Sequence, residues 1–140
     1  MKSTWHALLG SAIVSICLRA VPFAQANPRP LVDAAWLQQA LAAGDVLVLD
    51  AQPGKMHEAG HIPGAVFMHL DALIDEAAPV ENTLPSPEKF ASRMQALGLG
   101  DGSRIVLYDD SALHSAARAW FMLKLFGAHD VAILDGGLAK

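Results

Sequence analysis

The chain has 140 residues, of which 53% are hydrophobic and 17% are charged, and its formal net charge is −4. This length limits the chain to one domain, and the composition is that of a globular protein with a core, not of a disordered chain. No block of basic residues occurs, so nucleic acid is not expected as a partner.

The first 26 residues have the pattern of a secretory signal peptide. Lys2 precedes an apolar run over about residues 7–18, and the segment ends in the small-x-small sequence Ala24-Gln25-Ala26. Arg19 leaves the apolar run too short for a stable membrane span. We expect cleavage after Ala26 and a periplasmic or secreted location. An uncleaved anchor at the membrane interface is the alternative.

Cleavage would leave residues 27–140 as the mature domain. It would remove Lys2 and Arg19 but no acidic residue, which changes the formal charge from −4 to −6. It would also remove Cys17, the only cysteine of the chain. The mature domain would then have no thiol, and therefore neither a disulfide nor a cysteine nucleophile.

Along the rest of the chain, predicted helices alternate with predicted strands. Asp33 is a plausible cap for a helix that ends near residue 43, and Ser86-Pro87-Glu88 has the residues that begin a helix ending near residue 97. A third helix is expected from Ser115 to about residue 126, and residues 51–60 are expected to form a loop. The predicted strands are residues 46–50, 64–68, 104–108 and 131–135.

This alternation predicts an α/β fold with a mostly parallel sheet and helices on both faces. Ligands of such sheets bind beyond the carboxyl ends of the strands. The candidate positions are therefore Asp50, residues 108–114 and residues 135–137.

Four stretches together carry a resemblance to a known family: "VLVLDA", "GHIPGAVFMHLD", "RIVLYDDSALHSAARAWFMLKLFG" and "VAILDGGLAK". Over about residues 31–140 the chain resembles the rhodanese domain, and more closely the N-terminal domain of tandem thiosulfate and 3-mercaptopyruvate sulfurtransferases. The resemblance implies a rhodanese-like fold whose last segment, after "LDGGLAK", is missing from this chain. It also implies a small sulfur-donor anion as substrate and no cofactor.

In catalytic members of this family, a cysteine begins a loop whose N–H groups surround its sulfur. The resemblance places Asp109 at this position, and a carboxylate cannot accept a sulfane sulfur. It implies that this chain alone has no catalytic nucleophile and is inactive, and that the working cysteine belongs to a second, C-terminal rhodanese domain. The matching loop is Asp109, Asp110, Ser111, Ala112, Leu113, His114 and Ser115.

Three further residues are candidates for accessory roles. The resemblance implies a substrate cleft between the two domains. Asp50 could orient a residue of this cleft, or it could accept backbone N–H groups of its own loop. His61, in "GHIPGA", could belong to a polar relay between the two domains, as the resemblance implies, or it could fix a turn. Arg118 lies near the start of a helix, where a cation is unfavourable, so Asp109, Asp110 or an anionic ligand is expected to offset its charge.

No metal site is expected, because His57, His69, His114 and His129 lack the spacing of metal ligands. The alternative to a sulfurtransferase domain is a stand-alone, non-catalytic rhodanese-like binding module. A small hydrolase built on Asp50 and His61 is disfavoured, because no paired acid or nucleophile accompanies them.

Overall fold

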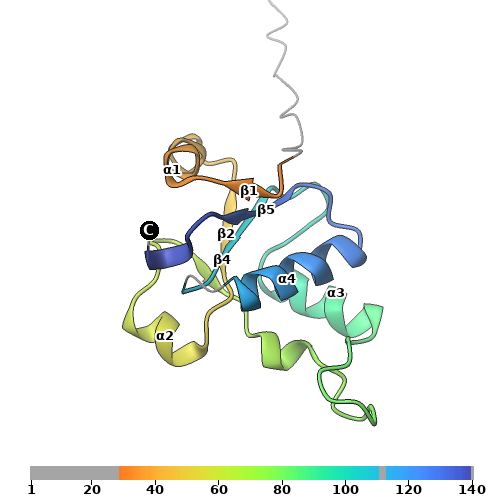
Figure 1. Ribbon diagram of the computed structural model, residues 1–140. Coiled ribbons are helices and arrows are strands. Elements are labelled where there is room, and N and C mark those ends of the chain that lie inside the picture. Colours follow the sequence, from red (N-terminus) through yellow and green to blue (C-terminus); the bar gives the residue numbers. More distant parts are fainter. Residues whose placement is uncertain (1–28, 111–112, 140) are drawn as a thin grey trace, which may run out of the picture.

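The computed structural model describes residues 29–110 and 113–139. In this part of the chain, parallel strands form one sheet in the order β1-β5-β4-β2-β3 (Figure 1). The predicted α/β class, with a parallel sheet and helices on both faces, is confirmed. The strands are β1 (Leu31–Val32), β2 (Leu47–Asp50), β3 (Val66–Phe67), β4 (Ile105–Tyr108) and β5 (Val131–Leu134). The helices are α1 (Ala34–Ala43), α2 (Gly54–Ala59), α3 (Pro87–Ala96) and α4 (His114–Leu125), with 3₁₀ turns η1 (Leu70–Leu73) and η2 (Gly137–Ala139).

The sheet separates two hydrophobic clusters. Helices α3 and α4 cover one face, and α1 covers the other (Figure 1). Successive side chains of a strand point to opposite faces, so Leu49 and Leu107 pack in the α3/α4 cluster, while Val48 and Val106 pack in the α1 cluster. Strands that are buried on both faces in this way read as continuous apolar runs, which is the pattern that predicted them.

Local signals in the sequence fix the ends of two helices as predicted. The Asp33 carboxylate accepts the Trp36 N–H at 2.8 Å and caps the start of α1, and Gly44, with φ 71°, follows its last residue. The Ser86 hydroxyl accepts the Lys89 N–H at 3.2 Å, and Pro87 is the first residue of α3. No helix within the described ranges is long and apolar enough to cross a membrane.

Two elements differ from the prediction. The loop prediction for residues 51–60 is wrong, because six of these residues form α2. This helix buries none of its residues, so its sequence carries no apolar periodicity that could have indicated it. Strand β1 was also missed: it has two residues, and its pairing with β5 comes from tertiary structure.

Candidate functional site

The carboxyl ends of β2 and β4 bring the predicted site residues to one edge of the sheet. The two strands are neighbours in parallel register, and Asp50 pairs with Tyr108. Their side chains therefore lie on the same face, and Asp109, one residue further along, points to the opposite face, toward α4. The edge thus carries two buried carboxylates, one on each side of the sheet: Asp50 is 0% exposed and Asp109 is 1% exposed.

Backbone N–H groups of the following loop and helix surround the Asp109 carboxylate. Its Oδ1 accepts the Leu113 N–H and its Oδ2 accepts the Ala116 N–H, both at 3.1 Å. Ala116 lies in the first turn of α4, where unpaired N–H groups and the helix dipole favour a negative charge. The Asp109 carbonyl accepts the Leu138 N–H at 2.9 Å, which ties the loop to η2. The chain therefore forms an anion cradle and places its own carboxylate in it.

The described residues of the predicted active loop flank this cradle. Leu113 has φ 59°, a left-handed conformation that turns the chain into α4. The helix begins at His114, one residue before the predicted Ser115. Asp110 is partly buried beside the cradle. Ser111 and Ala112 lie outside the described residues.

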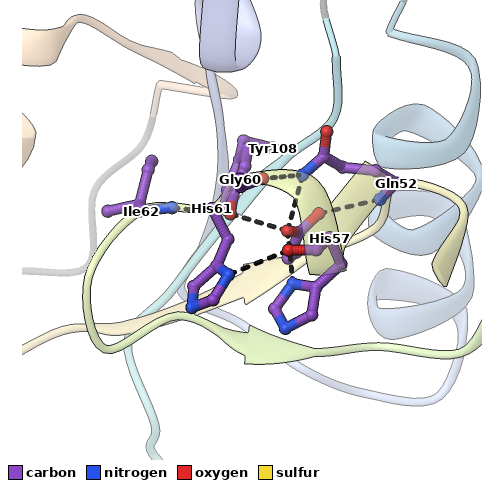
Figure 2. Close-up of polar contacts among 7 residues, drawn as sticks. Gln52, His57, Gly60, His61, Ile62 and Tyr108 are labelled. Atoms are coloured by element: carbon purple, nitrogen blue, oxygen red, sulfur yellow. Dashed lines mark hydrogen bonds and ion pairs between the residues drawn. The ribbon is translucent and has the colours of Figure 1, made fainter. Parts of the chain in front are cut away.

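On the other face, Asp50 is the centre of a side-chain network (Figure 2). One carboxylate oxygen accepts the Gln52 N–H at 2.9 Å. The other accepts the Gln52 amide, the His57 Nδ1–H and the Tyr108 hydroxyl, each at 2.7 Å. The Tyr108 oxygen in turn accepts the Ile62 N–H at 3.0 Å, and the Gln52 amide also donates to the Gly60 carbonyl at 3.1 Å. The network fastens the segment from Gln52 to Ile62 to the end of the sheet.

This network changes the acidity of its members. Burial alone would raise the pKa of Asp50, but the hydrogen bonds from Gln52, His57 and Tyr108 outweigh burial and lower it below its ordinary value. Burial, followed by the hydrogen bond to Asp50, raises the pKa of Tyr108 far above its ordinary range. Asp50 is therefore the charged acceptor and Tyr108 the neutral donor over the whole physiological range.

The structure gives His61 and Arg118 backbone carbonyl partners, and for Arg118 this differs from the expected acidic partner. The His61 Nδ1–H donates to the His57 carbonyl at 2.9 Å, and the Asp50 carboxylate binds His57 and not His61. The Arg118 guanidinium donates to the Asn82 carbonyl at 2.9 Å. Within the described residues it forms no ion pair with Asp109 or Asp110.

Sequence reasoning did not assign a role to three members of the Asp50 network, which are Gln52, His57 and Tyr108. Tyr108 was a candidate only through its place at the end of a strand. His57 and Gln52 lie in the segment that was predicted to be a loop, and only the α2 turn brings His57 back to Asp50. One signal was available, since a buried strand that ends in a carboxylate requires nearby donors.

The fold and the edge of the sheet define a class of α/β domain in which a strand, a short loop and a helix N-terminus enclose one anionic group. The chain belongs to the Rhodanese-like domain family, whose profile matches residues 33–140.

Relatives of this family support the same assignment. The chain is 41% identical over 118 residues to the 3-mercaptopyruvate sulfurtransferase of Escherichia coli K12, an alignment that covers 77% of this chain and 42% of the relative. It is 39% identical over 135 residues to the human 3-mercaptopyruvate sulfurtransferase, with 95% and 42% covered. Among solved structures, SseA from Escherichia coli superposes with a TM-score of 0.74 at 38% identity, covering 79% of this chain and 46% of that one. The chain therefore spans less than half the length of these relatives.

Proposed function

We propose that this chain is the N-terminal, non-catalytic rhodanese domain of an exported two-domain sulfurtransferase. The complete protein would move sulfur from thiosulfate or 3-mercaptopyruvate to a thiophilic acceptor. The substrate classes are those in the names of the relatives. The observation that carries the proposal is the Asp109 carboxylate, whose two oxygens accept the N–H groups that would otherwise surround a sulfur atom.

The chemistry explains why this domain needs a partner. A thiolate attacks the outer sulfur of thiosulfate, forms a persulfide and releases sulfite, and the persulfide then passes its sulfur to the acceptor. A carboxylate oxygen forms no such persulfide, and the described residues contain no cysteine. The negative charge of Asp109 also repels an anionic donor from the loop. In this proposal the reacting cysteine belongs to a second rhodanese domain. The N-terminal domain described here supplies one wall of the substrate cleft between the two domains.

A transfer assay tests this division of labour. The chain alone, supplied with thiosulfate or 3-mercaptopyruvate and cyanide, is expected to form no thiocyanate above the rate without protein. The Escherichia coli relative serves as the positive control under the same conditions. Thiocyanate formation by the chain alone would refute the proposed role of Asp109.

Export is the second part of the proposal. It rests on the cation, the apolar run and the Ala24-Gln25-Ala26 site in residues 1–26, which lie outside the described part of the chain. Mass spectrometry of protein from the periplasm of a bacterial host is expected to show Asn27 as the first residue. A chain that keeps Met1 and stays in the cytoplasmic fraction would contradict export.

The alternative is a stand-alone rhodanese-like binding module. The Asp109 cradle is compatible with it as well, since the carboxylate stabilises the loop without chemistry. The DNA sequence after the Lys140 codon separates the two functions. An in-frame second domain with a cysteine at the loop position supports the two-domain enzyme, and a stop codon supports the module.

A further inference from the structure

Helix α2 is held to the fold differently from the other helices. It buries none of its residues, whereas α1, α3 and α4 each bury apolar side chains. Among the described residues, neither hydrophobic cluster includes a side chain from residues 53–61. The chain on either side is fixed, because Ala51 packs in the α3/α4 cluster and Ile62 packs against the α1 cluster. Residues 53–61 therefore form a strap between two anchors, called the α2 strap below.

Polar contacts and one aromatic ring fasten the α2 strap to the sheet. The His57 Nδ1–H donates to the Asp50 carboxylate at 2.7 Å, and the Gln52 amide donates to the Gly60 carbonyl at 3.1 Å (Figure 2). The His57 ring also packs on the Phe67 ring, with centroids 5.0 Å apart. Each contact is made by a single side chain, so the strap depends on a few individual interactions and not on a shared apolar surface.

These contacts can break without leaving Asp50 unpaired. Asp50 also accepts the Tyr108 hydroxyl and the Gln52 N–H, and both donors lie outside the α2 strap. The Asp50 carboxylate therefore keeps hydrogen bonds on both oxygens when His57 leaves, which avoids most of the cost of an unsatisfied buried charge. Segments with few buried apolar contacts are those that open locally, at a lower free energy than global unfolding.

The position of the α2 strap gives such an opening a consequence. The strap covers Asp50 and one face of Phe67 at the carboxyl ends of β2 and β3, and ligands of parallel α/β sheets bind beyond this edge. We propose that the α2 strap is a gate, which opens as one unit while the sheet stays folded and uncovers Asp50 and Phe67 at the ligand-binding edge. Ala51 and Ile62 stay in place as its two hinges.

Residue-resolved hydrogen exchange of the full chain tests the gate. The His57 and Gly60 N–H groups are bonded inside the strap, to the Pro53 carbonyl at 3.1 Å and the Met56 carbonyl at 3.0 Å. They are expected to share one opening equilibrium and to exchange at least about 100-fold faster, relative to unstructured peptide, than the Ala51 and Met68 N–H groups.

The Ala51 and Met68 N–H groups are the matched reference, because they flank the α2 strap and bond to the Tyr108 carbonyl at 2.9 Å and the Asp50 carbonyl at 2.8 Å. Low concentrations of urea are expected to speed their exchange far more than that of the strap, since a local opening exposes little surface.

Two substitutions are expected to move the gate in opposite directions. His57→Ala removes the bond to Asp50 and is expected to speed exchange in the α2 strap at least about tenfold. Gly54→Ala is expected to slow it about threefold, because alanine favours the helix and its Cβ would lie 3.5 Å from the Phe67 ring, in ordinary contact. His69→Ala is the control, since this ring packs on Phe67 at 5.7 Å but lies outside the strap, and no change is expected.

Three results would overturn the gate. Exchange in the α2 strap with the rate and urea dependence of Ala51 and Met68 would mean that the strap unfolds only with the whole protein. Exchange at the rate of an unstructured peptide would mean that it has no closed state. Unchanged exchange in folded His57→Ala protein would mean that His57 does not fasten it. Gly54→Ala leaves every contact of Asp50 in place, so faster or unchanged exchange in this variant contradicts the gate even if His57→Ala fails to fold.

Discussion

Asp50 and Asp109 are both buried carboxylates at the ends of neighbouring strands, yet they are held in different ways. Side chains from three parts of the chain donate to Asp50, whereas backbone N–H groups of one loop and one helix donate to Asp109. A side-chain network depends on the identity of each member. A backbone cradle depends on the path of the chain and can hold any anionic group of suitable size. The Asp50 network therefore serves to hold the fold together. The Asp109 cradle is a site whose chemistry depends on the one residue that fills it.

The largest expected effect is at Asp50. The side chains of Gln52, His57 and Tyr108 donate to one oxygen of Asp50, and the Gln52 N–H donates to the other. Asp50→Asn keeps an acceptor oxygen at one of these two positions and turns an NH₂ group toward the donors at the other. We expect a loss of about 3 kcal/mol in the free energy of unfolding, the upper range for unpaired buried polar groups. Urea denaturation measures it, and Asp71→Asn, with a side chain that is 94% exposed, is the control with an expected change below about 0.5 kcal/mol. A loss below about 1 kcal/mol for Asp50→Asn would show that the network contributes little.

The pH dependence of stability sharpens this result. The folded pKa of Asp50 is lowered, so its contribution is present above the unfolded pKa of about 3.8 and is lost as the pH falls through the folded value. The unsubstituted protein is expected to lose stability below about pH 4 more steeply than Asp50→Asn. Equal acid slopes in the two proteins would contradict the lowered pKa.

Tyr108→Phe is expected to have an intermediate effect. It leaves the Ile62 N–H without its acceptor and removes one donor from Asp50, at a cost of about 2 kcal/mol. The pKa of Tyr108 is raised in the folded protein, so its contribution is fully present below the unfolded pKa of about 10 and is lost as the pH rises above it. Urea denaturation between pH 7 and pH 11 is expected to show an alkaline decline that Tyr108→Phe lacks. A decline of the same size in both proteins would assign it to other groups.

Asp109→Asn is expected to have the smallest effect. The amide oxygen still accepts one of the two N–H groups, so the expected loss is about 1 kcal/mol. Asp110→Asn is the matched control, because the Asp110 side chain makes no hydrogen bond within the described part of the chain. If Asp109→Asn cost as much as Asp50→Asn, the distinction between the backbone cradle and the side-chain network would be lost.

The parts of the structure that the sequence could predict are those with local causes. Asp33, Gly44 and Ser86 mark helix ends by hydrogen bonds and backbone preferences within a few residues, and the buried strands appear as apolar runs. The Asp109 loop was located because a strand, a polar loop and a helix follow one another directly. The contact between Asp50 and His57 was not predictable, since it depends on how an exposed, non-periodic helix folds back onto the sheet edge.

A thiol placed at position 109 tests the central claim, which is that the N–H groups of Leu113 and Ala116 form an anion cradle that is filled by the Asp109 carboxylate and would stabilise a thiolate in its place. The measurement is the titration of the thiolate by its ultraviolet absorbance in Asp109→Cys, with Asp110→Cys as the matched control and Cys17→Ser in both proteins. Converging N–H groups at a helix N-terminus stabilise a thiolate, so the pKa of the new cysteine at position 109 is expected at least about one unit below the ordinary value of about 8.5. The cysteine at position 110 is expected near the ordinary value. A folded Asp109→Cys protein whose thiol titrates like that control would contradict the account.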